Sequence, residues 1–231
     1  MKNESKGARA LHKNRKSSYD RIANYHKKYI DPKTGYWNNK YTTSRSCPVC
    51  NSDDSRLIFS KSGGNYHTCN QCTMVFTNPV FKDEALTEYY SYLDTGQGEI
   101  VENESLFYKE IYTKGLRSIE KIKDSGLILD VGCSTGFFLD ISKKSGWQTF
   151  GIELGLEESK VARSKGHNVL SCSIGQANFS SKFDVITLWD VFEHIPNPYR
   201  CLKELSMVLK KGGLIFLQIP NVGGLAPRLM Q

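Results

Sequence analysis

From about residue 127 onwards, short apolar runs alternate with amphipathic segments. The pattern predicts strands over 127–131, 148–153, 168–172, 183–190 and 214–219, and helices over 137–145, 157–165 and 198–209. The strand segments are nearly continuous apolar runs, which is typical of strands buried on both faces of a sheet. Strands that alternate with helices favour a parallel sheet covered on both sides. The predicted fold class is therefore α/β, a doubly wound and mostly parallel sheet.

The first half of the chain has a different pattern. It predicts a disordered basic tail over 1–16, a helical arm over 17–45, a small ribbon over 46–78 and a helical linker over 79–125, ahead of the α/β domain at 126–231. The arm places Tyr29 and Ile30 on one apolar face of a helix, and Asp31-Pro32 ends that helix. We expect this face to dock against the body of the protein.

Two Cys-x-x-Cys pairs define the ribbon. Cys47 and Cys50 are separated from Cys69 and Cys72 by 18 residues, which is the spacing of a four-cysteine zinc ribbon. Each pair points two thiolates at one centre, and two pairs complete a tetrahedron. Alternating segments between the pairs predict a hairpin, and so small a unit depends on a metal for its folding. We predict one structural zinc ion; the alternative is a redox or free-thiol site.

Composition and charge limit the other classes of function. The chain has 231 residues, and none of its apolar runs is long enough to cross a bilayer. No apolar segment follows the basic N-terminus, so we expect no secretory signal and a cytoplasmic protein with reduced cysteines. The net charge of +7 is concentrated in residues 1–46, which hold 12 Lys/Arg and 3 Asp/Glu. Such an arm either contacts phosphates or is a solvated tail.

The segment Leu127-Ile-Leu-Asp130-Val-Gly132-Cys-Ser134-Thr-Gly136 carries the strongest functional signal. It predicts a buried strand, a tight turn and the start of a helix, whose first N–H groups have no intrahelical partner. Glycines let the backbone turn sharply and let a ligand approach closely. The next predicted strand ends in Glu153, about where a dinucleotide-type fold places a carboxylate on a ribose.

Four motifs then appear in order: Asp130-Val-Gly-Cys-Ser-Thr-Gly, Phe150-Gly-Ile-Glu153, Phe183-Asp-Val-Ile-Thr-Leu-Trp-Asp190-Val-Phe-Glu-His194-Ile-Pro, and Leu209-Lys-Lys-Gly-Gly-Leu-Ile-Phe-Leu-Gln-Ile-Pro-Asn221. Together they resemble the class I S-adenosylmethionine-dependent methyltransferases, over roughly residues 105 to 221. One departure is Ser134, where the family usually has a second glycine. With the ribbon in front, the chain is similar to methyltransferases that carry a zinc module ahead of the catalytic domain.

The resemblance implies S-adenosyl-L-methionine as cofactor and a set of residues that bind it. These are Asp130, Gly132, Ser134, Gly136, Glu153 and Asp190. Glu153 is expected to accept hydrogen bonds from both ribose hydroxyls. Gly132 is expected to bring backbone close to the methionine end, and Asp130 to order the loop or reach the amino group of the cofactor.

The segment from Asp190 to His194 offers three ionisable groups at positions i, i+3 and i+4. If it turns helically after its strand, all three share one face. His194 is then the candidate catalytic base, with Glu193 to orient it. Two other roles stay open: His194 shapes the loop or positions substrate, or it joins a divalent-ion site like that of similar O-methyltransferases of ubiquinone synthesis.

Three functions are carried forward. The first is methyl transfer to a small-molecule acceptor, a sugar, nucleotide-sugar or glycan precursor, as several methyltransferases of similar architecture perform. The second is RNA methylation, with the ribbon and basic arm gripping phosphates. Against it, residues 47–231 hold 19 Lys/Arg and 21 Asp/Glu, whereas an RNA-binding face shows clustered cations. The third is a truncated, non-catalytic protein that binds the cofactor.

The end of the sequence adds one expectation. The family's sheet usually gains a final antiparallel pair of strands, for which residues 222–231 are too few. We therefore expect either a C-terminally truncated domain or a sheet that ends early. The strand at 214–219 is then left with an uncovered edge, which invites self-association. The same argument predicts that this chain binds cofactor better than it turns over substrate.

Overall fold

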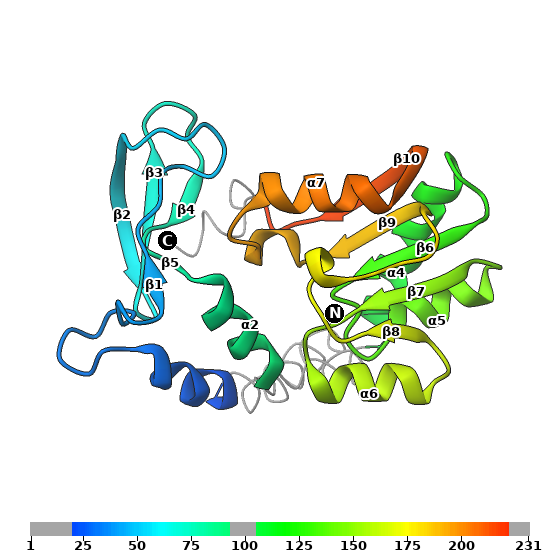
Figure 1. The fold of residues 1–231 in the computed structure, drawn as a ribbon, viewed down its shortest axis with the longest axis horizontal. Helices are drawn as coiled ribbons and strands as arrows, with labels where there is room; N and C mark the ends of the chain where they lie inside the picture. The colour runs from blue at the N-terminus through cyan, green and yellow to red at the C-terminus, as the bar shows by residue number, and fades with distance from the viewer. Residues whose placement is uncertain (1–19, 93–104, 222–231) are drawn as a thin grey trace, which may run out of the picture.

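The computed structural model describes residues 20–92 and 105–221, which form two lobes (Figure 1). The C-terminal lobe holds a five-stranded sheet in the order β10-β9-β6-β7-β8. Its strands are β6 (Leu127–Val131), β7 (Gln148–Ile152), β8 (Asn168–Leu170), β9 (Phe183–Trp189) and β10 (Leu209–Gln218), and all neighbours pair in parallel. The predicted doubly wound α/β fold is confirmed.

Helices cover both faces of this sheet because adjacent residues of each buried strand point to opposite sides. The helices are α4 (Ser105–Glu120), α5 (Phe137–Lys144), α6 (Leu156–Ser164) and α7 (Pro198–Val208). On β6, Ile128 packs with side chains of α4 and α5, whereas Leu129 packs with Leu205 of α7. Each of these three residues is fully buried. The core therefore lies in two layers, one on either face of β6 and β9.

The N-terminal lobe contains a ribbon and a small aromatic core. The ribbon consists of β2 (Ser55–Lys61), β3 (Gly64–Cys69) and β4 (Val75–Thr77), paired antiparallel. Beside it, β1 (Thr42–Thr43) pairs with β5 (Val80–Phe81), which leads into α2 (Asp83–Tyr92). Residues 20–26 are helical and continue into the 3-10 turn η1 (Lys27–Tyr29). As predicted, the face of this arm docks: Tyr29 is completely buried against Phe81 and Ala85.

One boundary differs from the sequence prediction. The last strand was predicted over 214–219, but β10 begins at Leu209, directly after α7 ends at Val208. The pairing of β10 with β9 shifts register between Leu209 and Leu214, and Gly212 adopts a φ of 72° inside that irregularity. The two glycines therefore allow a bulge in this strand. The expectation about the sheet beyond Asn221 falls outside the described residues, as does the predicted tail at 1–16.

The sheet is oriented so that the carboxyl ends of its strands face the N-terminal lobe, with α2 between the two (Figure 1). Ligands of doubly wound sheets bind at this end. No helix within the described ranges is long and apolar enough to cross a membrane. Of the cysteines outside the ribbon, Cys133 and Cys201 are buried in the core, whereas Cys172 is only partly buried.

Candidate cofactor site and cysteine cluster

The loop between β6 and α5 has the geometry of a ligand cradle. Gly132, Ser134 and Gly136 all have left-handed backbone conformations, with φ of 77°, 47° and 82°. A Cβ atom on Gly132 would lie 2.5 Å from Val191 Cγ2, so only glycine fits there without displacement. The left-handed conformation of Ser134 also gives a physical reason why a glycine is usual at this position.

Glu153 holds this loop closed. Its Oε2 accepts a hydrogen bond from the backbone N–H of Ser134 at 2.7 Å, and its Oε1 accepts one from the N–H of Gly155, also at 2.7 Å. Burial raises the pKa of Glu153, while these N–H donors favour the carboxylate. A carboxylate has about four acceptor positions. Glu153 therefore retains capacity for further donors while it fixes the loop.

Asp130 lies beneath the loop, at the end of β6. Its side chain is buried, and Thr187 Oγ1 of β9 donates a hydrogen bond to its Oδ1 at 2.7 Å. Burial raises the pKa of Asp130 to about 8, and the nearby Glu153 carboxylate adds to this effect. A buried acid with so high a pKa is typical of a functional site.

A small cavity of about 20 Å³ opens beside Asp130. It is lined by Tyr112, Asp130, Gly132, Cys133, Ser134, Thr135, Phe137, Phe138 and Trp189. Two of these residues carry buried polar atoms without a hydrogen-bond partner among the described residues, namely Ser134 Oγ and Trp189 Nε1. Buried polar atoms are nearly always paired in folded proteins, so unpaired atoms in a glycine-rich cradle fit a polar ligand such as the predicted cofactor.

The segment after β9 differs from the prediction in one respect. Asp190, Glu193 and His194 were expected on one helical face, but Asp190 lies ahead of the short 3-10 turn η3 (Phe192–His194) with a φ of 51°. Asp190 Oδ2 instead accepts a hydrogen bond from Gln218 Nε2 of β10 at 2.9 Å. Asp190 therefore belongs to the strand end rather than to a shared face.

Glu193 and His194 do lie together. His194 Nε2 is 3.9 Å from Glu193 Oε1, and burial raises the pKa of Glu193. The ring of Tyr90, from α2 of the other lobe, packs edge-on against the ring of His194 at 6.0 Å between centroids. The side chain of His194 remains 55% exposed. A histidine that is held by neighbours and open to solvent has the access that a proton-transfer group needs.

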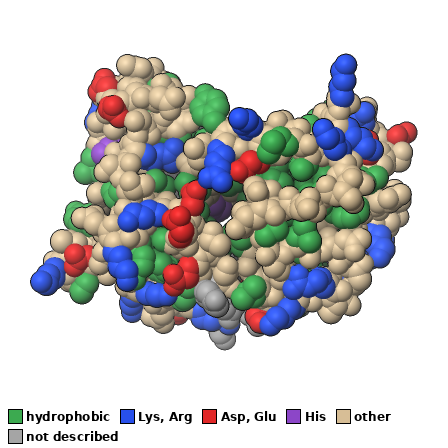
Figure 2. Space-filling view, viewed as in Figure 1, with side chains coloured by type: hydrophobic (Ala, Val, Ile, Leu, Met, Phe, Trp, Pro, Cys, Tyr) green, Lys and Arg blue, Asp and Glu red, His purple; other side chains and the backbone are tan. Residues whose placement is uncertain are grey.

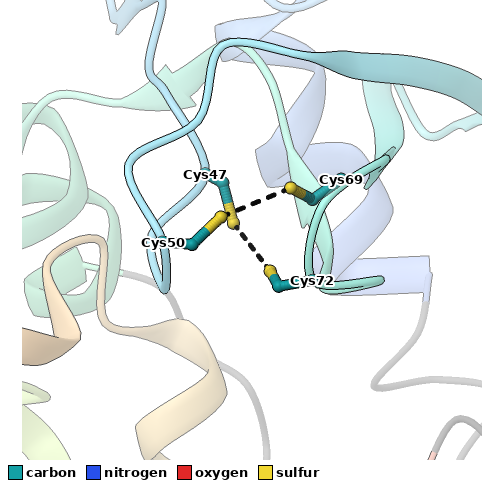
Figure 3. A group of neighbouring side chains, drawn as sticks. All are labelled: Cys47, Cys50, Cys69 and Cys72. Atoms are coloured by element: carbon teal, nitrogen blue, oxygen red, sulfur yellow. Dashed lines mark hydrogen bonds between the residues drawn. The ribbon is translucent and has the colours of Figure 1, made fainter.

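The four ribbon cysteines form one cluster (Figure 3). Their Sγ atoms all lie within 4.8 Å of one another, and the pairs Cys47–Cys72 and Cys50–Cys69 are each 3.5 Å apart. Zinc with sulfur ligands at about 2.3 Å requires tetrahedron edges of about 3.8 Å. The sulfur set therefore fits a tetrahedral ion.

A cleft of about 490 Å³ separates the lobes and is lined by both. Figure 2 shows the surface hollowed there, with acidic and basic side chains around the opening. From the N-terminal lobe come Thr43, Arg45, Ser46, Cys47, Pro48, Asn51 and residues 80–84, and from the other lobe residues 196–199. Hydroxyl, amide and charged groups of both signs line this cleft, so it suits a polar ligand.

The structure thus brings the predicted residues into three groups. Asp130, Gly132, Ser134, Gly136 and Glu153 form the cradle, Glu193 and His194 face α2, and the cysteines cluster apart from both. Sequence reasoning did not assign Thr187, Tyr112 or Tyr90 to the site. A polar Thr187 in the centre of a buried strand was an available signal, whereas Tyr90 reaches His194 only through the packing of the lobes.

Comparisons with known proteins agree with this geometry. Residues 105–231, more than half of the chain, match a family described as "Methyltransferase domain". The ubiquinone biosynthesis O-methyltransferase of Serratia proteamaculans (strain 568) is 32% identical over 103 residues, which are 41% of this chain and 42% of that protein. Its counterpart in Colwellia psychrerythraea (strain 34H / ATCC BAA-681) is 30% identical over 102 residues, again 41% and 42%. The chain spans about two fifths of the length of these curated relatives.

Among solved structures, the plantazolicin methyltransferase in complex with SAH superposes with a TM-score of 0.52 at 21% identity, over 63% of this chain and 61% of that one. This likeness concerns the fold. The chain therefore belongs to the methyltransferase-domain family and has the doubly wound fold of the class I S-adenosylmethionine-dependent methyltransferases.

Proposed function

We propose that the protein transfers a methyl group from S-adenosylmethionine to a small polar acceptor. The observation that carries this proposal is the closed cradle at the carboxyl edge of the sheet, where Glu153 accepts hydrogen bonds from both Ser134 and Gly155. Such a cradle, in a methyltransferase-domain chain, presents a buried acid and unpaired polar side-chain atoms to one ligand. The relatives named above support the same class of reaction.

Within the cradle, each residue has a distinct role. Glu153 accepts hydrogen bonds from the ribose hydroxyls, and its existing bonds to the loop hold its carboxylate in place. Gly132 brings the backbone close to the methionine portion, and Asp130, fixed by Thr187, faces the amino group. The cofactor, when bound, supplies a methyl group already activated on a positively charged sulfur. The protein contributes position, which by itself can lower a barrier by about 7–11 kcal/mol.

His194 is assigned the proton-transfer role. It is an exposed ionisable group beyond the end of β9, and it lies between Glu193 and Tyr90. Acceptance of a proton at the imidazole creates a cation, which the Glu193 carboxylate at 3.9 Å stabilises. The role is needed where the acceptor must lose a proton as the methyl group arrives.

The acceptor is placed in the cleft between the lobes. Its polar lining, which includes Arg45, Lys82, Asp83 and Glu84, suits a ligand rich in hydroxyl groups or carrying an anionic substituent. A sugar, nucleotide-sugar or glycan precursor has this chemistry. The relatives are named as O-methyltransferases of ubiquinone biosynthesis, so a phenolic quinone precursor is the alternative acceptor to test.

The four cysteines are assigned one zinc ion with a structural role. A catalytic zinc keeps an open coordination position, whereas four thiolates fill a tetrahedral shell. The ion would replace the apolar core that the ribbon lacks, since its buried cluster consists of Cys47, Cys69 and Phe76.

The proposal is tested by incubation with methyl-labelled S-adenosylmethionine and three acceptor sets: nucleotide-sugars, phenolic quinone precursors and total RNA. We expect label in a low-mass acceptor, and loss of transfer in His194→Ala at unchanged SAH affinity. Label confined to RNA would replace the acceptor class with nucleic acid. Tight SAH binding without transfer to any set would leave a non-catalytic cofactor-binding protein.

A further inference from the structure

The loop that carries Glu193 and His194, residues 190–197, is held from two sides. Its own lobe anchors the beginning, where the N–H of Asp190 donates to the carbonyl of Gln218 at 2.9 Å and turn η3 closes on itself. The far end, from Pro196 into α7, meets the N-terminal lobe. The position of His194 therefore depends on contacts that cross between the lobes.

Arg45 makes the first of these contacts. Its Nη1 donates to the carbonyl oxygen of Pro196 at 2.6 Å, and its Nε donates to the carbonyl of Ser46 at 3.3 Å. Proline has no N–H, so this carbonyl is the main-chain hydrogen-bonding group that residue 196 offers. The Arg45 backbone is itself fixed by a hydrogen bond from its N–H to Asn78 Oδ1 at 3.1 Å.

Tyr199 makes the second contact from the opposite direction. Its hydroxyl donates to the carbonyl oxygen of Val49 at 2.8 Å. Val49 lies between Cys47 and Cys50, inside the first Cys-x-x-Cys turn, which we call the knuckle (residues 47–51). The knuckle closes through the N–H of Asn51, which donates to the carbonyl of Cys47 at 3.0 Å. The position of the Val49 carbonyl is thus set by the turn that presents the sulfur atoms.

Arg45 and Tyr199 connect the knuckle segment with the far end of the His194 loop in both directions. Arg45 lies two residues before the knuckle and reaches Pro196, two residues after His194. Tyr199, three residues after Pro196, reaches back into the knuckle. Two crossed hydrogen bonds between two short segments define their relative position better than one bond does. A knuckle that loses its turn would lose the Val49 acceptor and release the far end of the loop.

We infer that Arg45 and Tyr199 are positioning residues, which tie the folded state of the cysteine knuckle to the position of the His194 loop. The hydrogen bonds that shape the cofactor cradle do not cross between the lobes, because Gly132, Ser134 and Glu153 are bonded within their own lobe. The inference rests on the proposed function only in the role given to His194; the mechanical linkage itself stands without it. Loss of the folded turn in the knuckle then disturbs proton transfer and acceptor alignment, while the affinity for SAH persists.

The experiment measures backbone hydrogen exchange of residues 191–197 in the full chain, without acceptor. The variants are Arg45→Met, Tyr199→Phe and the double variant. Tyr199 is 60% exposed, so the loss of its hydroxyl leaves the core intact. We expect each variant to raise exchange in the loop by about 2- to 10-fold, the effect of one lost hydrogen bond. Exchange in β6 and the dissociation constant for SAH should stay within about twofold, since neither depends on these bonds.

Matched controls are Arg56→Met and Tyr36→Phe, the same substitutions at exposed positions that make no hydrogen bond to the loop among the described contacts. A chelator then tests the linkage. Metal release should raise loop exchange in the wild-type chain and add little in the double variant, because the connection is already cut. An unchanged loop in the double variant, or an equal effect of the chelator in both proteins, would overturn the inference. Failure of SAH binding or methyl transfer would leave this result unaffected, so the two proposals fail separately.

Discussion

The parallel sheet and the cysteine ribbon bury their side chains to very different extents. In β9 six of the seven residues from Phe183 to Trp189 are buried, whereas six of the seven residues of β2, after Ser55, are exposed. The sheet is stabilised by apolar side chains packed on both faces. The ribbon has a few buried sulfur and aromatic groups, so its order depends on what the sulfur atoms bind. One lobe can thus respond to metal while the other keeps the cofactor cradle.

Removal of the metal should produce the largest difference in exchange protection between the two lobes. We expect one zinc per chain by elemental analysis, and loss of exchange protection over residues 46–78 in a Cys50→Ser/Cys72→Ser protein. Structural zinc sites contribute about 10 kcal/mol or more to folding, far more than the small ribbon core can replace. Protection in β6 and β9 should persist. The absence of metal from freshly purified, reduced protein, or an unchanged ribbon in the cysteine variant, contradicts the assignment.

Truncation of one apolar side chain should lower the free energy of unfolding strongly in the sheet and very little in the ribbon. Ile186 of β9 is fully buried, and Ile186→Ala should lower the free energy of unfolding by about 2–5 kcal/mol. Leu57 of β2 is 54% exposed, and Leu57→Ala should change it by no more than about 0.5 kcal/mol. Denaturant unfolding followed by far-UV circular dichroism measures both. Similar losses in the two variants would mean that the ribbon has an apolar core after all.

The pH dependence of stability should reveal the buried acid of the cradle. Burial raises the pKa of Asp130 to about 8 in the folded chain, whereas an unfolded chain has a value near 3.9. Between these values the folded state holds the extra proton. The free energy of unfolding therefore falls as pH rises through this window, by up to about 1.4 kcal/mol per pH unit.

Asp130→Asn, which resembles the protonated acid, should remove that part of the slope. The measurement is the difference between wild type and variant in denaturant unfolding at several pH values from 5 to 9 in equal steps of about one unit. Thr187→Val serves as a control that keeps the acid but removes its hydrogen-bond donor. Parallel pH profiles for wild type and Asp130→Asn would show that Asp130 is ionised throughout.

The sequence located the loop after β6 and the strand end at Glu153 because their signals are local. Apolar runs identify strands that a parallel sheet buries on both faces, and Gly132 and Gly136 mark a turn that needs left-handed conformations. The acid at Glu153 follows from the same strand periodicity. Likewise, the two Cys-x-x-Cys pairs predict their own convergence, because each pair forms a local turn.

The other features of the site and of its surroundings depend on contacts between segments far apart in the chain. The Asp190 side chain turns to Gln218 rather than to His194, since the strand pair β9–β10 places that amide beside it. Gly115 of α4 lies so close to Trp189 that a Cβ atom would come within 2.2 Å of the indole, a packing constraint that periodicity does not reveal. The bonds of Arg45 and Tyr199 between the lobes arise only once both lobes are folded.

The central claim, that the β6–β7 cradle binds S-adenosylmethionine through Glu153, is tested most directly by calorimetric titration of SAH into wild type and Glu153→Ala. Loss of the charge-assisted bonds should cost about 2–4 kcal/mol of binding free energy. Glu157→Ala, at an exposed acid on α6, is the matched control and should bind as wild type does. A thermal unfolding scan of each protein separates lost binding from lost folding. Equal SAH affinity in wild type and a folded Glu153→Ala protein would contradict the account.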